Sequence, residues 1–197
     1  MKTSYLRASA AGVLICMGCI VNLKVGGGIP GAILFSAGLW FVVNFDAELF
    51  TGRVTQERYR PEQKMIMLVF NVLGAAACGL LASVFLPDIQ EGAAKIAAGY
   101  QDPLKVLWQS VMCGICMYLA TTPPVKADIG RLPFVIYGVA LFILSGYAHS
   151  IAMAGYAAIA RGVVWWAIPL AALGNAAGSY LIRLLLTGKP FQKKAKE

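Results

Sequence analysis

The sequence predicts an all-α membrane protein with six transmembrane helices, and three observations lead to this fold class. Apolar residues make up 59% of the 197 residues and charged residues only 13%, which lies outside the range of soluble globular domains. The apolar residues gather in blocks of roughly the 20 residues that a helix needs to cross a bilayer. The basic residues fall mostly between these blocks, where they set the orientation of a membrane protein.

Six blocks approach the length of a span, and they leave almost no chain for a soluble domain. They are residues 8–23, 29–51, 65–86, 103–121, 133–159 and 162–186. The first block has a basic start, but no small-x-small cleavage site follows it, so we interpret it as a retained span and not as a secretory signal. We predict a six-span domain over residues 1–187 and a basic tail over residues 188–197.

Polar or small residues interrupt the blocks 29–51 and 133–159. The first block runs into residues 44–48 (Asn-Phe-Asp-Ala-Glu), and the second runs into residues 145–150 (Ser-Gly-Tyr-Ala-His-Ser). Each is the middle span of a three-span half, and two matching broken spans indicate an inverted 3+3 repeat whose breaks meet near the midplane. Weaker echoes between the halves are the two Cys-x-x-Cys pairs, in the first and fourth blocks, and the residues Asn71 and Asn175.

The Lys and Arg residues predict that both chain termini face the cytoplasm. Thirteen of the 17 lie near the termini or in the segments near 52–64 and 122–132, which six spans place on one side. The other side carries Lys24, Lys95, Lys105 and Arg161. This asymmetry fits the positive-inside rule for an inner (plasma) membrane. The basic tail either contacts anionic membrane lipid or only sets the orientation. Because no folded basic surface is expected, no nucleic-acid partner is predicted.

Five cysteines lie within the apolar blocks: Cys16, Cys19, Cys78, Cys113 and Cys116. Each Cys-x-x-Cys pair places two thiols one helical turn apart, but neither segment supplies the further ligands of a four-coordinate structural zinc site. We therefore interpret the cysteines as small buried apolar residues, and we predict no metal and no cofactor.

His149 is the only histidine of the chain, and it lies in the interruption of the block 133–159. An ionisable ring at this depth needs a partner or a water-filled cavity. It is either a buried neutral ring bonded to a backbone carbonyl or a group that lines a path for small ions. Two broken helices would also direct free backbone N–H groups at the centre, which attracts anions.

Four motifs in the same order resemble the formate/nitrite transporter family, over about residues 8–187. Residues 35–39 (Phe-Ser-Ala-Gly-Leu) and 47–52 (Ala-Glu-Leu-Phe-Thr-Gly) resemble its second span and omega loop. Residues 145–150 resemble its Ser-Gly-Phe-Glu-His-Ser signature. Residues 173–178 (Leu-Gly-Asn-Ala-Ala-Gly) resemble its Leu-Gly-Asn-x-x-Gly signature.

The resemblance implies an aquaporin-like six-helix protomer, a homopentamer with one pore per protomer, and passage of small monovalent anions such as formate, nitrite or hydrosulfide. By position, His149 resembles the central pore histidine and Thr51 its hydrogen-bonding partner. Asn175 resembles a pore asparagine of the sixth span, and Lys95 a lysine near the pore entrance. The two hydrophobic constrictions of the family correspond to Phe35, Leu39 and Phe142 and to Leu49, Phe50 and Met117.

Four positions depart from the family pattern and put the substrate in question. An acidic residue, two asparagines and a glycine of the family are replaced here by Ala148, Met153, Gly114 and Asp46, respectively. We expect Asp46 and Glu48 to cap a helix start or to pair with a cation such as Arg53. Thr51 has a simple helix cap as its alternative role.

The predicted function is passage of small monovalent anions, with formate or nitrite favoured by the aromatic pair Phe35 and Phe142. Hydrosulfide or another weak-acid anion is the alternative, and His149 donates either a proton or only a hydrogen bond. An intramembrane enzyme is the rival class. Ser36 and Ser110 lie in no recognisable nucleophile motif, and a single histidine excludes a bis-histidine haem subunit and a helical two-histidine zinc protease.

Overall fold

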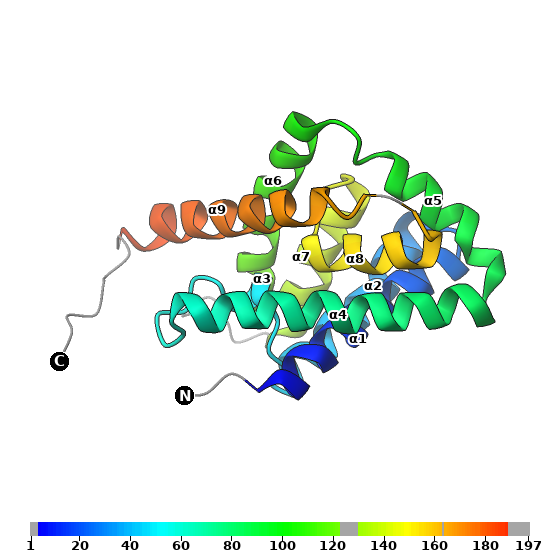
Figure 1. Ribbon diagram of the computed structural model, residues 1–197. Helices are drawn as coiled ribbons and strands as arrows, with labels where there is room; N and C mark the ends of the chain where they lie inside the picture. The colour runs from blue at the N-terminus through cyan, green and yellow to red at the C-terminus, as the bar shows by residue number, and fades with distance from the viewer. Residues whose placement is uncertain (1–3, 123–129, 163, 189–197) are drawn as a thin grey trace.

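The computed structural model describes residues 4–122, 130–162 and 164–188, and every regular element within them is helical (Figure 1). The elements in chain order are α1 (Tyr5–Lys24), α2 (Gly28–Asn44), α3 (Phe50–Arg53), α4 (Pro61–Phe85), a 3₁₀ turn (Pro87–Ile89), α5 (Gln90–Ala98), α6 (Pro103–Thr121), α7 (Leu132–Leu144), α8 (Ser150–Ala160) and α9 (Ala167–Thr187).

The predicted blocks correspond to these helices, with two interruptions. The first, third, fourth and sixth blocks become α1, α4, α6 and α9, which are the four described helices long and apolar enough to cross a membrane. The block 29–51 forms α2 and α3 around residues 45–49, and the block 133–159 forms α7 and α8 around residues 145–149. The all-α membrane fold class is confirmed, and the count of six spans stays a prediction.

Helix contacts repeat between the two halves of the chain. α1 packs mainly on α4 and α2, and α6 packs in the same way on α9 and α7. The second helices of the two halves, α2 and α7, pack on each other. The short α3 contacts α6, α4 and α9, just as α8 contacts α1, α9 and α4. This correspondence of α1–α4 with α6–α9 is the arrangement that an inverted repeat produces.

Glycines allow the long helices of each half to approach to backbone contact. A Cβ atom on Gly12 of α1 would lie 2.0 Å from the carbonyl oxygen of Asn71 in α4. A Cβ atom on Gly114 of α6 would lie 2.1 Å from that of Asn175 in α9. Small residues permit this spacing between membrane helices. Gly114 therefore faces α9.

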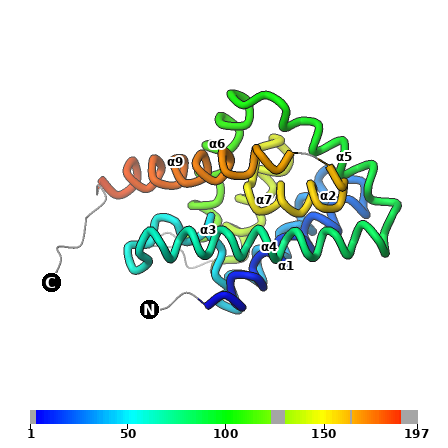
Figure 2. Tube along the Cα trace, viewed as in Figure 1, coloured from blue at the N-terminus to red at the C-terminus, as the bar shows by residue number. Residues whose placement is uncertain are grey.

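The two ends of the bundle differ, as Figures 1 and 2 show. The segment from α3 into α4 and the C-terminal end of α9 lie at one end, on the left, and the turn from α4 into α5 lies at the other. This separation agrees with the two sides expected from the basic residues, while the assignment of the left end to the cytoplasm stays a prediction. Residues 189–197 of the predicted tail lie outside the described residues.

The connection between α4 and α6 contains helical structure that the sequence analysis did not predict. Its helix α5 is amphipathic, with Ala93 and Ala97 buried and with Glu91 and Lys95 exposed. The buried face packs on α8. Alanine favours helices but adds little to the hydropathy of a segment, so the apolar blocks of the sequence do not include this helix.

Candidate functional site

The two breaks, residues 45–49 and 145–149, have the same backbone hydrogen bonds. In each break one N–H group donates to the preceding helix at 2.9 Å, and the next donates to α1 or α6 at 3.3 Å. In the first break Ala47 donates to Val42 and Glu48 donates to Arg7. In the second break Tyr147 donates to Phe142 and Ala148 donates to Gln109. A residue of the first break thus corresponds to the residue numbered 100 higher in the second.

Asn71, which is fully buried in α4, satisfies backbone groups that the first break leaves free. Its Oδ1 atom accepts a hydrogen bond from the N–H group of Phe50 at 2.7 Å. Its Nδ2 atom donates to the carbonyl of Glu48 at 2.8 Å and to that of Ala8 at 2.7 Å. Unpaired backbone groups are costly in an apolar interior, so this side chain stabilises the break.

Asn175 of α9 forms the equivalent clamp on the second break. Its Oδ1 atom accepts from the N–H group of Ser150 at 2.9 Å, and its Nδ2 atom donates to the carbonyls of Ala148 and Ser110, each at 2.9 Å. The sequence analysis assigned Asn175 to the pore. In the structure its amide is fully buried and bonded to backbone on both sides, so it stabilises the second break.

His149 joins the two halves at the start of α8. Its Nδ1 atom accepts a hydrogen bond from the N–H group of Ala152 at 3.1 Å, and its Nε2 atom lies 2.8 Å from Oγ1 of Thr51. Because a backbone N–H group can only donate, Nδ1 carries a lone pair, and a neutral ring then has its proton on Nε2. Nε2–H therefore donates to Thr51, whose hydroxyl proton remains available to a further acceptor.

Two cavities lie at the breaks. The larger, about 600 Å³ and here called the arginine cavity, is lined in part by Arg53, Arg58, Arg131 and Arg183. The smaller, about 250 Å³ and here called the tyrosine cavity, is lined in part by Tyr100, Tyr147 and Tyr156. Each cavity therefore combines an apolar helical frame with polar side chains, as ligand sites commonly do.

The two cavities use equivalent positions of the two breaks. Residues 42, 43, 46, 47 and 49 line the arginine cavity, and residues 142, 143, 146, 147 and 149 line the tyrosine cavity. His149 lines the tyrosine cavity, while Leu49 and Gly52, on either side of the Thr51 segment, line the arginine cavity. The hydrogen bond between Thr51 and His149 therefore links the walls of the two cavities.

Five of the six predicted constriction residues share one buried apolar cluster, and Phe142 among them contacts His149. Phe35, Leu39, Phe142, Leu49 and Met117 are buried in the same apolar cluster. The Phe142 ring stacks on the His149 ring at 5.5 Å between centroids and meets the Phe35 ring edge-on at 5.6 Å. The sixth residue, Phe50, packs instead in a separate cluster with Tyr59 and Met67. The structure therefore does not group Phe50 with Leu49 and Met117.

Lys95 does not line either cavity. It lies on α5 with 75% of its side chain exposed, and its Nζ atom lies 2.8 Å from Oε1 of Glu91. The Glu91 carboxylate raises the pKa of Lys95, and the Lys95 ammonium lowers the pKa of Glu91. Lys105, near the start of α6, lines the tyrosine cavity instead. We did not predict Lys105 for this site, although its place at the start of a span was a usable signal.

The polar pair Asn22 and Tyr156 in the tyrosine cavity was also missed. Both side chains are buried, and Nδ2 of Asn22 donates to the Tyr156 hydroxyl at 3.0 Å. Polar residues inside apolar helices often mark ion paths, so the sequence offered Asn22 and Tyr156 as candidates.

The rival enzymatic groups are engaged elsewhere. The Ser36 and Ser110 hydroxyls donate to carbonyls of their own helices, those of Ile33 and Val106, at 2.5 and 2.6 Å. All five cysteines are free thiols, and within the described part of the chain no group of three or more His, Cys, Asp or Glu residues is arranged to hold a metal. Among the described residues, the polar partners of the His149 ring are Thr51 and Ala152.

Comparison with known proteins decides the family. The model of the formate/nitrite transporter family matches residues 1–188. The chain belongs to the formate/nitrite transporter family. Two solved structures share the fold of this chain. A pentameric formate channel with formate bound has a TM-score of 0.71 and 19% identity, over 92% of this chain and 94% of its own. An FNT family ion channel has a TM-score of 0.76 and 21% identity, over 94% and 90%. Among curated proteins, none matches the chain.

Proposed function

We propose that this protein lets small monovalent anions, formate or nitrite first, pass through a membrane between the arginine cavity and the tyrosine cavity. The observation that carries the proposal is the buried hydrogen bond between Thr51 and His149, which joins two interrupted helices between two cavities. Family membership and the similarity to a formate channel support this function.

The apolar cluster around the pair supplies selectivity in this proposal. A hydrated ion cannot pass a dry apolar constriction without losing water, and this cost rejects strongly hydrated ions. The rings of Phe35 and Phe142 and the side chain of Leu39 flank the path and are almost fully buried. A small anion that sheds its water then accepts a hydrogen bond from the Thr51 hydroxyl and replaces the Thr51 oxygen as the acceptor of the His149 Nε2–H.

We further propose that His149 acts as a hydrogen-bond donor and stays neutral during passage. Protonation of Nδ1 would remove the acceptor that the Ala152 N–H group uses. It would also place a charge among apolar side chains, which is costly. Transport then follows the anion gradient, and any proton that accompanies the anion comes from water in a cavity.

The proposed assembly rests on a solved structure of similar fold, and the proposed orientation rests on the distribution of the basic residues. The formate channel of similar fold is pentameric, and we propose a homopentamer with one path per protomer. The basic residues around the arginine cavity support an orientation in the plasma membrane in which this cavity and both termini face the cytoplasm.

The test is anion flux into lipid vesicles that contain the purified protein. Formate, nitrite, hydrosulfide and chloride are compared at several pH values, with the variants His149→Leu and His149→Asn. We expect His149→Leu, which installs the residue of the equivalent position Leu49, to lower formate flux about 10- to 100-fold, because a desolvated anion loses a hydrogen-bond donor.

His149→Asn retains an amide donor and a capping oxygen, so we expect it to keep most of the flux with unchanged pH dependence. A pH dependence that disappears in His149→Asn would show instead that the ring titrates during transport. Wild-type vesicles that pass none of the four anions would overturn the proposed function.

A further inference from the structure

Asp46, in the first break, adopts a backbone conformation that usually requires glycine. Its φ angle is 51°, and the equivalent residue of the second break, Gly146, has a φ angle of 66°. A side chain other than that of glycine costs about 1–2 kcal/mol in this left-handed region. An aspartate at this position therefore needs a compensating interaction.

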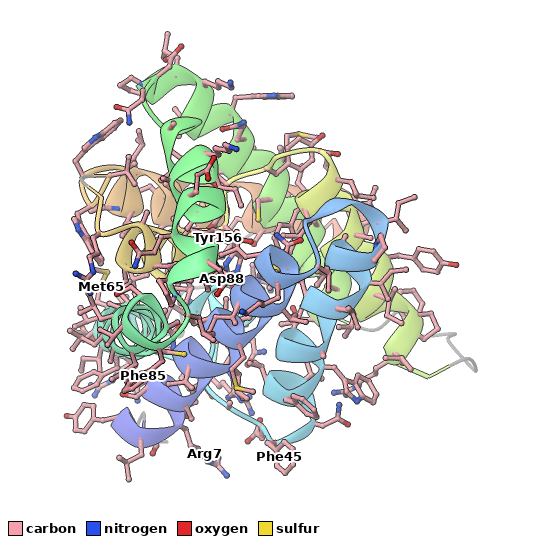
Figure 3. The ribbon with its side chains drawn as sticks, turned by 90° about the vertical axis from the view of Figure 1, so that its right-hand side faces the viewer. Arg7, Phe45, Met65, Phe85, Asp88 and Tyr156 are labelled. Atoms are coloured by element: carbon pink, nitrogen blue, oxygen red, sulfur yellow. The ribbon has the colours of Figure 1, made fainter. Side chains whose placement is uncertain are left out.

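The Asp46 carboxylate bridges two arginines from different helices. Its Oδ1 atom lies 2.5 Å from Nη2 of Arg53, which follows the break in α3, and its Oδ2 atom lies 3.2 Å from Nη1 of Arg7 in α1. Figure 3 shows Arg7 and the adjacent Phe45 at the lower edge of the bundle, away from Asp88. Each carboxylate oxygen thus binds a different guanidinium group.

Arg53 is held in place independently of this carboxylate. Its side chain is only 7% exposed. Nη2 also donates to the carbonyls of Asp46 and Ala47, at 2.9 and 3.2 Å, and Nη1 donates to the Tyr59 hydroxyl. The guanidinium group therefore keeps its position when the Asp46 side chain leaves, which a binding site for a free ligand requires.

The Asp46 side chain, in contrast, is 60% exposed, and it lines the arginine cavity together with Arg53. Leu49, two residues before Thr51, also lines this cavity, whereas Arg7 does not line it and reaches the Asp46 carboxylate from α1. The Asp46 side chain ends in a carboxylate group, the same group that makes up a formate ion. Asp46 and an entering formate ion therefore compete for the same guanidinium N–H donors.

We propose that Arg7 and Arg53 form a binding site for small carboxylates and that Asp46 occupies this site as a built-in competitor. The inference rests on the proposed function for its choice of formate as the ligand. A carboxylate that reaches the arginine cavity displaces the Asp46 side chain, binds between the two guanidinium groups and is released when Asp46 returns. The competitor keeps binding weak, and weak binding allows an ion to leave a path.

The test measures formate binding to the purified protein in detergent, by calorimetry and by the formate-dependent rise of its unfolding temperature. Asp46→Asn removes the competing charge, and we expect the dissociation constant for formate to fall about fivefold. The matched control is Asp88→Asn. Asp88 also has a side chain that is 60% exposed and also pairs with a cation, Lys24 at 2.7 Å, but it lines neither cavity. It should leave formate binding unchanged.

Arg7→Gln combined with Asp46→Asn separates a two-arginine site from a general change in charge. The proposal requires that the gain of Asp46→Asn disappear in this double variant but persist in Asp46→Asn combined with Lys95→Gln, which has the same net charge, whereas a mere change of net charge would remove the gain in both. Asp46→Gly is measured in parallel, because glycine adopts this φ angle without strain and keeps the test decisive if the asparagine variant does not fold.

The inference is overturned if Asp46→Asn and Asp46→Gly bind formate no better than the wild type, or if the gain survives the loss of Arg7. Vesicle flux distinguishes this failure from that of the proposed function. Unchanged binding in variants of a protein that conducts formate rejects the site alone. Tighter binding in variants of a protein that conducts no formate supports the site and rejects the channel.

Discussion

The two breaks have the same backbone hydrogen bonds and differ in most of their side chains. Both leave their first helix at the same relative residue, donate to α1 or α6 in the same way and are clamped by a buried asparagine. The first break carries Asp46, Glu48 and Leu49 where the second carries Gly146, Ala148 and His149. The helices that follow also differ, since α3 has four residues and α8 has 11.

The asparagine clamps stabilise the backbone of both breaks, so the side chains of the breaks can differ without loss of the backbone geometry. The first turn of the long α8 supplies the Ala152 N–H group that orients the His149 ring. The short α3 has few hydrogen bonds of its own, and the Arg53 guanidinium group ties the neighbouring loop carbonyls together instead. One break thus orients the His149 ring, and the other is secured by charge.

The largest expected effect comes from removing a clamp. Asn71→Ala and Asn175→Ala each leave an N–H group and a carbonyl of a break unpaired in an apolar interior. We expect each substitution to reduce the free energy of unfolding by about 2–5 kcal/mol. The two losses should be similar, because the two sets of bonds are equivalent. Thermal unfolding of the protein in detergent measures them.

Asn44→Ala is the matched control for the clamps. Asn44 is exposed at the end of α2 and donates only to the Trp40 carbonyl of its own helix, at 2.7 Å. We expect its unfolding temperature to stay near that of the wild type. A large loss from Asn71→Ala together with a negligible one from Asn175→Ala would show that the two breaks are not equivalent in energy.

The sequence predicts the breaks well because Asn, Asp, Gly and Ser are rare inside apolar blocks. It also pairs Asn71 with Asn175 correctly. It does not say that these amides face backbone, since an asparagine that clamps a loop and one that lines a pore look alike in a sequence. The Cys-x-x-Cys echo is misleading: when Gly12 is matched with Gly114, Cys113 corresponds to Ala11, so the cysteine pairs are not equivalent.

The location of the cations is likewise beyond what spacing can predict. Lys95 lies between α4 and α6 and Lys105 lies in the first turn of α6, and only the fold of α5 turns Lys95 outwards to Glu91. The pairing of Asp46 with Arg53 was among the alternatives that the sequence allowed, because a carboxylate near an apolar core requires a cation or N–H donors.

A smaller effect tests the symmetry of the helix crossings. Gly12→Ala and Gly114→Ala each place a methyl group about 2 Å from a carbonyl oxygen of the facing helix. We expect each to lower the free energy of unfolding by about 1–3 kcal/mol, because the two backbones must separate. Gly92→Ala is the control, since a Cβ atom there meets only a Leu23 side chain at 3.1 Å, and it should be neutral or slightly stabilising. A loss of stability in Gly12→Ala without a loss in Gly114→Ala would show that the α1–α4 and α6–α9 crossings are not equivalent in energy.

The smallest expected effect concerns the different numbers of basic residues that line the two cavities. The arginine cavity has four arginines, whereas the tyrosine cavity has Lys105 as its one Lys or Arg among the described lining residues. If Lys105 attracts anions from solution, Lys105→Gln should lower formate flux about two- to fivefold at low ionic strength, and the difference should shrink as salt screens the charge. Lys95→Gln, which removes an exposed lysine that lines neither cavity, should leave the flux and its salt dependence unchanged. A loss of flux that is equal in both variants would mean that net charge on this side, and not the position of Lys105 at the cavity, governs the approach of the anion.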